Sequence, residues 1–385
     1  MADAWRPTAT APALRKRAEV LAAVRAFFAR RDVLEVETPL LAAAPVTDLH
    51  LHAMSCRYRG PGHDGGRKLW LQTSPEFAMK RLLAAGSGPI YQLCKAFRDG
   101  EAGSRHNPEF TILEWYRPGW DHHRLMDEVA ELLHTVLGER RVGLAAPVSM
   151  PTGAVGAAVD PVPVPDEAVS EPGSVAVADD RGRFRFRGSG SGSDSGSGSG
   201  SGSGSERITY RGAMHHHIGI DPVTASLAEI ADAAREHIDS PPDLGNDRDG
   251  WLDLLMSHIV EPKLGRGRPT FVIDYPASQA ALARIRPGDP PVAERFEVYV
   301  EGVELANGYH ELAEPAEQRR RFGADLAARR DAGLPEVPID ERLLAALEHG
   351  MPDCAGVALG VDRLVMLAAG AERIDEVIAF PIDRA

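Results

Sequence analysis

The first regular pattern in the chain is helical. Apolar side chains recur every three or four residues in the set Leu14, Ala18, Leu21, Val24 and Phe28. This spacing predicts an amphipathic helix over residues 13–31. An extended apolar segment follows over residues 33–41 and ends near Pro39. The chain is therefore predicted to begin with a helix that leads into a strand.

Two apolar runs farther along predict a long β-hairpin. Residues 90–97 form the first run and residues 110–116 the second, with a polar, glycine-containing stretch between them. Side chains alternate along a strand, so one face of the second run carries Phe110, Ile112, Glu114 and Tyr116. Burying Glu114 on that apolar face is costly unless a cation or several hydrogen-bond donors meet it. We therefore expect Glu114 to bind a cationic group.

The stretch between these strands contains Arg98, Arg105 and His106, which suit an anionic group such as a phosphate. A strand over residues 69–72 precedes this hairpin. Ser74 as N-cap and Pro75 at the first position then predict a helix that ends near Gly86. Glu76, in the first turn of that helix, either complements the helix dipole or binds a substrate.

A second hairpin is predicted over residues 296–312, with Glu301 and Gly302 as its turn. This turn places Tyr299 opposite Glu304 and makes Glu297 a diagonal neighbour of Glu304. Two such carboxylates repel each other unless a cation lies between them, and their hard oxygen atoms suit Mg²⁺. The alternative is a solvated sheet face.

Beyond this pair, Asn307, Tyr309 and Glu311 alternate onto one face and again combine an aromatic ring with a carboxylate. Near the C-terminus, a glycine-spaced apolar strand begins at Cys354 and leads into a helix with Arg363 in its first turn. A helix N-terminus together with an arginine is an anion-binding arrangement. We expect it to bind phosphate oxygens.

Residues 141–206 differ in composition from the rest of the chain. They are rich in Pro, Ala and Val and then, over residues 188–205, consist almost entirely of Gly and Ser. Such a segment buries too little apolar area to offset the entropy cost of ordering it. We therefore expect a disordered insertion within one domain that spans residues 1–385.

Composition and charge narrow the class of protein. A chain of 385 residues with 43% hydrophobic side chains is typical of a soluble globular protein, and a net charge of -13 weighs against a general nucleic-acid binder. No apolar run is long enough to span a membrane. The three cysteines are far apart and indicate neither a disulfide framework nor a cysteine zinc site, which fits the cytoplasm. The run of three histidines at 215–217 lacks acidic partners and is interpreted as coincidence.

The stretch from Lys95 to Tyr116 contains Phe-Arg-Asp-Gly-Glu and Arg-His-Asn-Pro-Glu-Phe-Thr. It resembles motif 2 of the class II aminoacyl-tRNA synthetases, most closely the lysyl branch. The helix and strand over residues 13–41 resemble motif 1, and the segment from Cys354 through Arg363 resembles motif 3. The resemblance implies an α+β catalytic core with an antiparallel sheet flanked by helices. It also implies a homodimer formed through motif 1.

The resemblance further assigns roles to individual residues. Arg98 and Arg363 are the expected catalytic residues, with Arg98 on the α-phosphate and with Phe110 and Arg363 on either face of the adenine. The expected ligands of ATP are Arg98, Glu101, His106, Asn107, Phe110 and Arg363, and those of Mg²⁺ are Glu297 and Glu304. The expected amino-acid pocket consists of Ser74, Glu76, Glu114, Tyr116, Asn307, Tyr309, Glu311 and Ala358.

Only about a dozen residues precede the motif 1 helix, so we expect no anticodon-binding OB domain. The pattern resembles the truncated lysyl paralogues that modify translation elongation factor P. The Leu-Glu-Trp-Tyr-Arg-Pro run after motif 2 and the Cys-Ala-Gly-Val-Ala-Leu-Gly run carry this likeness. In the latter, Ala358 replaces a glycine typical of lysyl synthetases, and one added methyl group is worth ~1–3 kcal/mol of discrimination. The insertion departs from the pattern, as does Gly100, which leaves Glu101 as the motif 2 carboxylate.

This resemblance implies an ATP-dependent ligase. It would activate lysine, and by preference (R)-β-lysine, as an adenylate and transfer it to the ε-amine of a lysine on elongation factor P. Two alternatives remain. One is aminoacylation of tRNA by a minimal catalytic core, against which the net negative charge of the chain weighs. The other is a non-catalytic regulatory protein. ATP–pyrophosphate exchange separates the enzymes from the regulator.

Overall fold

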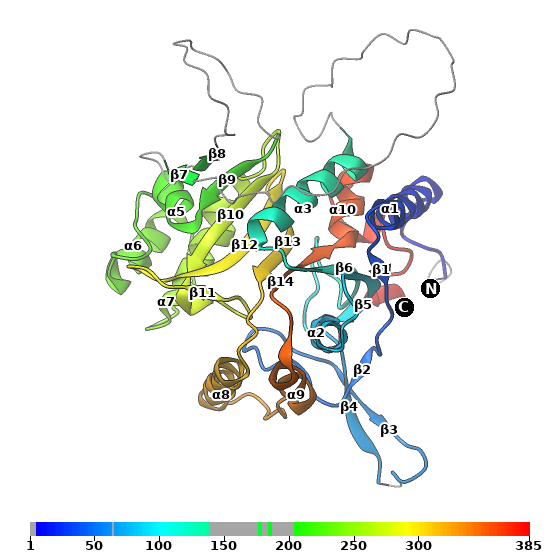
Figure 1. The fold of residues 1–385 in the computed structure, drawn as a ribbon. Helices are drawn as coiled ribbons and strands as arrows, with labels where there is room; N and C mark the ends of the chain where they lie inside the picture. The colour runs from blue at the N-terminus through cyan, green and yellow to red at the C-terminus, as the bar shows by residue number, and fades with distance from the viewer. Residues whose placement is uncertain (1–4, 64, 139–175, 179–183, 187–203) are drawn as a thin grey trace, which may run out of the picture.

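The structure is a computed structural model of the chain, and it describes residues 5–63, 65–138, 176–178, 184–186 and 204–385. A nine-stranded sheet forms its centre (Figure 1). Its order is β1-β5-β6-β14-β13-β12-β10-β9, and β11 pairs with β12 at the side. The strands are β1 (Leu34–Glu35), β5 (Ile90–Phe97), β6 (Glu109–Pro118), β9 (Glu206–Thr209), β10 (Thr270–Pro276), β11 (Ile285–Arg286), β12 (Val292–Val300), β13 (Val303–His310) and β14 (Cys354–Gly360). Neighbours are antiparallel except β1 with β5 and β9 with β10, which are parallel.

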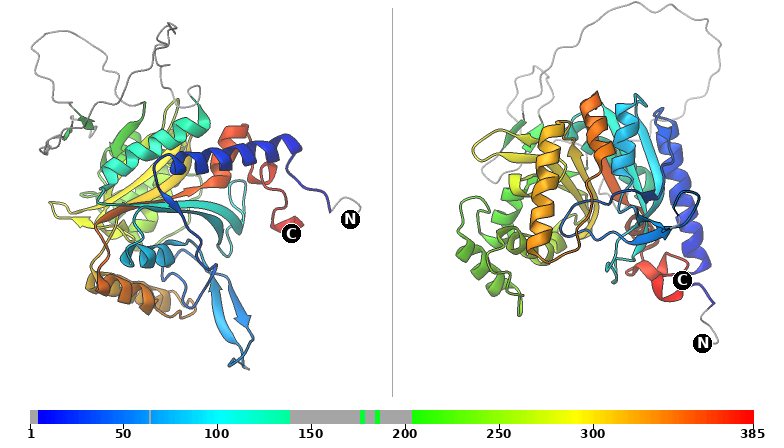
Figure 2. Two further views of the ribbon diagram at one scale, coloured as in Figure 1. Left: turned by 45° about the vertical axis from the view of Figure 1, so that its right-hand side comes forward. Right: turned by 90° about the horizontal axis from the view of Figure 1, so that it is seen from below.

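Three helices cover one face of this sheet: α1 (Ala11–Ala29), α3 (His122–Leu137) and α10 (Val361–Ala369) (Figure 2). Their apolar side chains share a core with the strands, in which the ring of Phe28 stacks on Tyr91 with 4.5 Å between centroids. The predicted N-terminal helix is confirmed. It begins two residues earlier than expected because the side chain of Thr10 accepts a hydrogen bond from the Ala13 amide and Pro12 occupies its first turn.

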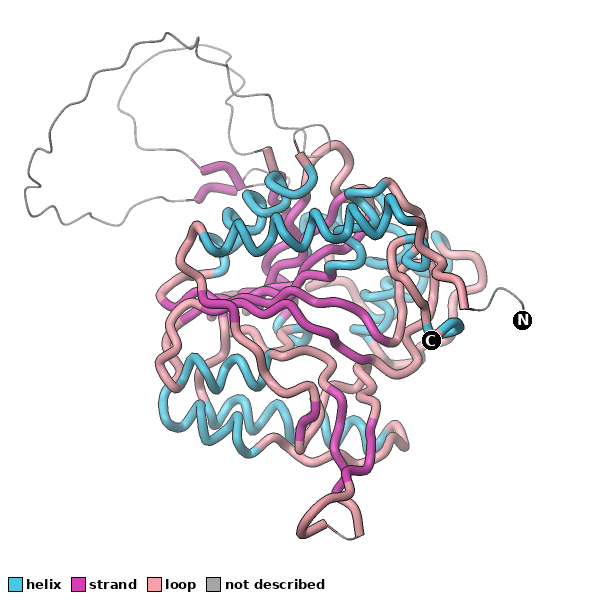
Figure 3. Tube along the Cα trace, turned by 90° about the vertical axis from the view of Figure 1, so that its right-hand side faces the viewer, coloured by secondary structure: helices cyan, strands magenta, loops and turns pink. Residues whose placement is uncertain are grey.

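The opposite face carries α2 (Glu76–Ala84), α8 (Pro315–Asp331) and α9 (Glu341–Gly350), so the sheet lies between two helical layers (Figure 3). The cap of α2 is Pro75 rather than Ser74, although the Ser74 hydroxyl still accepts a hydrogen bond from the Glu76 amide at 3.0 Å. A third helical group, α5 (Tyr210–Ile218), α6 (Leu227–His237) and α7 (Arg248–Leu255), packs against β9 and β10.

Smaller elements complete the described residues. β2 (Leu41–Ala42), β4 (Arg67–Leu71) and β3 (Ser55–Tyr58) form a three-stranded sheet whose β3–β4 hairpin projects from the body (Figure 1). Single helical turns lie at 256–260, 261–263, 277–279, 374–376 and 382–384. The fold class predicted from the sequence, an α+β core with a mainly antiparallel sheet flanked by helices, is confirmed.

Most of the segment predicted to be a disordered insertion lies outside the described residues. Within it, β7 (Ala176–Ala178) pairs antiparallel with β8 (Phe184–Phe186). Its last residue, Glu206, belongs to β9 and therefore to the central sheet. None of the described helices combines the length and apolar character that crossing a membrane requires.

Candidate active site

The expected carboxylate Glu114 lies in the middle of β6 and is 2% exposed. Its two oxygens accept hydrogen bonds from the Ser74 hydroxyl at 2.9 Å and from the Tyr116 hydroxyl at 2.7 Å. Burial, and next the nearby carboxylate of Glu76, raise the pKa of Glu114 to about 8. The hydroxyls of Ser74 and Tyr116 therefore meet this carboxyl, and no cation pairs with it among the residues that the structure describes.

Lys80, which the sequence analysis missed, lies beside this group. Its ammonium is 2% exposed and pairs with Glu76 at 2.7 Å and with Glu311 at 2.6 Å. Burial disfavours the charged ammonium, but Glu311 and Glu76 outweigh that effect and raise the pKa of Lys80 above its ordinary value. Lys80 lies four residues after Glu76 on α2, so the i,i+4 spacing was the available signal for one of these two contacts.

Small residues of β14 lie beside these groups. Ala358 pairs in register with Glu114 on one side and with Asn307 on the other. Gly356 leaves room for larger neighbours, because a Cβ there would lie 2.3 Å from the Tyr116 ring and 2.4 Å from the Glu311 carboxylate. The structure thus brings together all eight residues predicted to bind the amino acid, and it adds Lys80 and Gly356.

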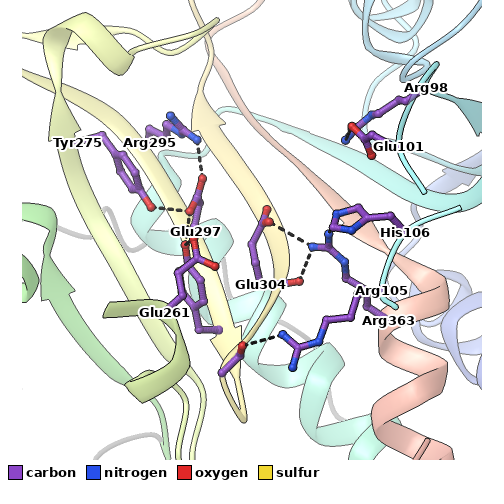
Figure 4. Close-up of polar contacts among 12 residues, drawn as sticks. Arg98, Glu101, Arg105, His106, Glu261, Tyr275, Arg295, Glu297, Glu304 and Arg363 are labelled. Carbon is purple, nitrogen blue, oxygen red and sulfur yellow. Dashed lines mark hydrogen bonds and ion pairs between the residues drawn. The ribbon is translucent and has the colours of Figure 1, made fainter. Parts of the chain in front are cut away.

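The phosphate-binding residues predicted from the sequence meet at the other end of the sheet. Arg363, near the start of α10, donates to the Glu304 carboxylate at 3.1 Å and to the Glu304 carbonyl oxygen at 2.9 Å (Figure 4). Its second nitrogen lies 2.6 Å from Nε2 of His106. Burial, and next the positive charge of Arg363, lower the pKa of His106, so a neutral imidazole accepts this hydrogen bond.

Arg98 follows β5, and its guanidinium lies 5.0 Å from the ring centroid of Phe110 and 3.5 Å from the Glu101 carboxylate. Arg98 is therefore the arginine that lies against Phe110 here, whereas the resemblance implies Arg363 on the far face of a bound adenine. Nε of Arg98 is buried without a hydrogen-bond partner among the described residues. Asn107 holds the loop in place, because its amide donates to the Glu109 carbonyl oxygen at 2.6 Å and accepts from the Ile382 amide at 3.0 Å.

The predicted hairpin of β12 and β13 is confirmed, with Val300 opposite Val303 and Tyr299 opposite Glu304. Glu301 and Gly302 form its turn with φ angles of 52° and 71°. A register shift after Val298 then places Glu297 opposite Asn307.

Glu297 is buried among donors instead of facing Glu304 alone. Its carboxylate pairs with Arg295 and accepts hydrogen bonds from the hydroxyls of Tyr275, at 2.6 Å, and Tyr299 (Figure 4). Arg295 also donates to the amide oxygen of Asn307 at 3.2 Å, so it connects the nucleotide end to the amino-acid pocket.

Glu261 is a third carboxylate that the sequence analysis missed. It follows α7 and lies 3.5 Å from the Tyr299 hydroxyl. Burial, followed by repulsion from Glu304 and Glu297, raises its pKa to about 7. No periodic pattern marks this residue, because it lies in a single helical turn between α7 and β10. The three acids provide hard oxygen donors of the kind that Mg²⁺ binds.

The site therefore has two halves that share the face of one sheet. One half offers buried carboxylates and small side chains to a compact cationic molecule. The other offers Arg98 and Arg363 to phosphates and three carboxylates to a hard cation. A nucleotide and an amine-bearing acid bound side by side would bring a carboxylate next to a phosphate, which is the geometry of acyl activation.

Comparison with known proteins agrees with this arrangement. Residues 2–384 match the family described as tRNA synthetases class II (D, K and N). A relative from Vibrio cholerae is 48% identical over 99% of this chain and 98% of its own length. Relatives from Klebsiella pneumoniae and Salmonella arizonae are each 46% identical over the same shares. All three bear the name elongation factor P–(R)-β-lysine ligase. This chain therefore belongs to the class II tRNA synthetase family of the D, K and N type.

Proposed function

We propose that this protein is an AMP-forming ligase that activates lysine, and by preference (R)-β-lysine, and transfers it to a lysine ε-amine of elongation factor P. The observation that carries the proposal is the cluster in which Glu76 and Glu311 pair with Lys80 and the buried Glu114 lies close to both acids. The shared name of relatives that match almost the whole chain supports the same substrate and acceptor.

ATP fits the second half of the site. The unpartnered, buried Nε of Arg98 provides a donor for a phosphate oxygen, and Arg363 at the start of α10 provides another. Phe110 offers a ring face to adenine, Glu101 and Asn107 line the loop, and His106 orients Arg363. Glu297 and Glu304, with Glu261, would hold Mg²⁺, which when bound neutralises phosphate charge.

The amino acid fits the first half. Glu76, Glu114 and Glu311 bind its two ammonium groups, and Ser74 and Tyr116 fix the carboxylate of Glu114. Asn307 and Tyr309 line the side of β13, and the methyl group of Ala358 lies between Asn307 and Glu114 in register. That methyl group changes the pocket floor by one carbon and favours one lysine isomer over the other.

The reaction follows from these positions. A carboxylate oxygen of the bound amino acid attacks the α-phosphorus of ATP, an O–P bond forms, and the bond to the β-phosphate breaks with release of pyrophosphate. Arg98 and Arg363 stabilise the charge that develops on the phosphate oxygens. The acceptor amine then attacks the acyl carbon, an amide forms, AMP leaves and the amine loses a proton. Positioning and charge stabilisation suffice, and no protein nucleophile is needed.

The assembly we propose is a cytoplasmic homodimer formed through α1 and the following strand. Leu34 in β1, the edge strand of the central sheet, and Leu41 in β2, an edge strand of the three-stranded sheet, support it, because they expose 57% and 42% of their surface. Exposed leucines on an edge strand favour a partner chain. Molar mass from light scattering tests this, and a monomer at micromolar concentration would contradict it.

The decisive experiment is the intact mass of elongation factor P after incubation with this protein, ATP, Mg²⁺ and each lysine isomer. We expect a gain of one lysyl unit, in higher yield with (R)-β-lysine. An Arg98→Ala variant is the negative control. Adenylate formation without a mass gain on elongation factor P would contradict the proposed acceptor and favour tRNA. Absence of ATP–pyrophosphate exchange would favour a non-catalytic regulator.

A further inference from the structure

A second cluster of ligand-type side chains lies outside the active site. His122 is the first residue of α3, Glu294 is in β12, and His310 is the last residue of β13. One ligand atom from each lies within 4.8 Å of the others. Arg295 and Tyr309 form a register pair that lies in the active site, so the alternation of side chains places Glu294 and His310 on the other face of the sheet, beneath α3.

The strongest feature of this cluster is His122. Its side chain is 2% exposed, and neither ring nitrogen has a hydrogen-bond partner among the described residues. A buried imidazole without a partner loses its hydrogen bonds to water and gains nothing in return. A ligand that accepts the lone pair of one ring nitrogen would remove this cost.

Both ring nitrogens of His310 lie at hydrogen-bond distance from a carboxylate oxygen. Its Nε2 lies 3.0 Å from the Asp353 carboxylate, and Arg284 holds that carboxylate at 2.6 Å. Its Nδ1 lies 2.6 Å from Oε2 of Glu294. A carboxylate that accepts the N–H of a ligating histidine fixes the tautomer and directs the other nitrogen toward the ion. Here Asp353 fixes Nε2–H and leaves Nδ1 for the ion.

We propose that His122, Glu294 and His310 form a binding site for a divalent transition-metal ion of the Zn²⁺ class. Two imidazole nitrogens and one carboxylate oxygen favour Zn²⁺ or Co²⁺ over Mg²⁺, which prefers an all-oxygen set. The ion takes the place of the proton between Nδ1 of His310 and Oε2 of Glu294. These two atoms then move from hydrogen-bond distance to the wider spacing of two ligands on one metal. A water molecule completes four-coordination.

The charges around the cluster permit a cation. Arg286 lies 3.9 Å from the other oxygen of Glu294 but pairs more closely with Asp274, at 2.7 Å, and Arg284 pairs with Asp353. Each guanidinium therefore has a carboxylate close by. Glu294 is partly exposed, so an ion can reach its carboxylate. Because the site joins α3 to both strands of the active-site hairpin, the ion would stabilise the sheet directly behind the amino-acid pocket.

The test is a titration of chelator-treated protein with Co²⁺ in excess Mg²⁺ and without ATP, followed by absorption and by melting temperature. We expect one Co²⁺ per chain with the intense visible bands of four-coordination, a raised melting temperature, and loss of the bands when Zn²⁺ is added. Excess Mg²⁺ occupies the all-oxygen carboxylates, and octahedral Co²⁺ there would absorb only weakly.

Variants separate this site from other histidines. His122→Leu and Glu294→Gln should each abolish the bands, and Asp353→Asn should weaken binding by roughly 10–100-fold. His216→Asn, in the exposed histidine run of α5, is the matched control and should bind as the wild type does. Circular dichroism confirms folding, and Glu294→Gln provides the test if the buried His122→Leu does not fold. Co²⁺ bands that survive in either folded variant, or their absence in the wild type, would overturn the proposal.

Discussion

The two halves of the active site handle charge in opposite ways. In the amino-acid half, Glu114, Glu311 and Lys80 are buried, Lys80 and Glu311 have side chains that are 2% and 1% exposed, and the side chain of Glu76 is 16% exposed. In the nucleotide half, the pairs of Arg363 with Glu304 and of Arg98 with Glu101 have side chains that are 21–35% exposed. The first set is more deeply buried, whereas the second is partly solvated and screened.

This difference indicates how each half accepts its substrate. Under the proposed function, three acidic side chains and one lysine leave the amino-acid half with two acidic groups in excess, which would match the two ammonium groups of a bound lysine. Burial keeps these groups in place before the substrate arrives. In the nucleotide half, Arg363 and Glu304 neutralise each other, so binding of phosphate and Mg²⁺ under the proposed function would require an exchange of partners. The first half is preorganised, and the second rearranges.

Removal of the buried cation should give the largest effect on stability. Lys80→Met leaves Glu76 and Glu311 without their ammonium, and breaking a buried ion pair on one side costs about 3–5 kcal/mol. Urea unfolding followed by circular dichroism measures this. Arg81→Met, the next residue on α2 and exposed, is the matched control and should change the free energy of unfolding by less than about 0.5 kcal/mol. A Lys80→Met protein as stable as the wild type would mean that the pocket is not held by this charge.

Arg363→Ala should have the largest effect on catalysis with little effect on stability. Loss of a group that stabilises developing charge lowers the rate of ATP–pyrophosphate exchange by about 10²–10³-fold. The free energy of unfolding should fall by about 1 kcal/mol or less, because the pair with Glu304 is partly exposed. Arg373→Ala removes an exposed arginine paired with Asp375 and should leave the exchange rate unchanged. Equal rates for both variants would exclude Arg363 from the reaction.

The buried carboxyls make amino-acid binding depend on pH. The pKa of Glu114 is about 8 because of burial and the Glu76 carboxylate, and the proton must leave before Glu114 can bind an ammonium. Binding should therefore tighten as pH rises from 6 to 8, by up to about tenfold per unit for each proton released. Calorimetry in buffers of different ionisation enthalpy measures both affinity and proton release.

The sign of the stability effect follows from the same shift. A carboxyl whose pKa is raised in the folded protein stabilises the folded state fully at a pH below its unfolded pKa. This stabilisation is lost progressively as the pH rises from the unfolded pKa to the folded pKa. Glu114 thus lowers stability as pH rises from about 4.5 to about 8. Glu114→Gln should flatten the dependence of the free energy of unfolding on pH in this range. It should also flatten the pH dependence of amino-acid binding. A wild-type protein with constant affinity from pH 6 to 8 would show that Glu114 is already ionised.

Local patterns predicted the elements of this site, and long-range packing decided their partners. The turn at Glu301 and Gly302 and the shared face of Glu114 and Tyr116 follow from turn chemistry and alternation within one strand, so the sequence sufficed. Lys80 meets Glu311 across 231 positions of sequence, and only the packing of α2 against the end of β13 brings them together. No local pattern contains that information.

The register shift after Val298 is likewise not contained in any local sequence pattern. It moves Glu297 opposite Asn307, whereas a regular ladder would have placed it opposite Ala306. The spacing of the two acids contains no sign of this irregularity. Glu261, which reaches the same region from outside the sheet, was missed for the same reason.

The smallest effect is expected at Glu101, and it tests whether the nucleotide half really rearranges. Glu101→Gln removes the partner of Arg98 in a partly exposed pair 3.5 Å apart, so the free energy of unfolding should change by no more than about 1 kcal/mol. If Glu101 only restrains Arg98, the KM for ATP stays the same or falls, because Arg98 no longer has to leave a carboxylate. If Glu101 contacts the nucleotide, as the family resemblance implies, the KM for ATP rises while that for lysine stays constant. Steady-state kinetics with each substrate varied in turn distinguishes these outcomes, and Glu109→Gln, which removes the exposed partner of Lys95, is the matched control. A change in lysine KM alone would contradict the division of the site into two halves.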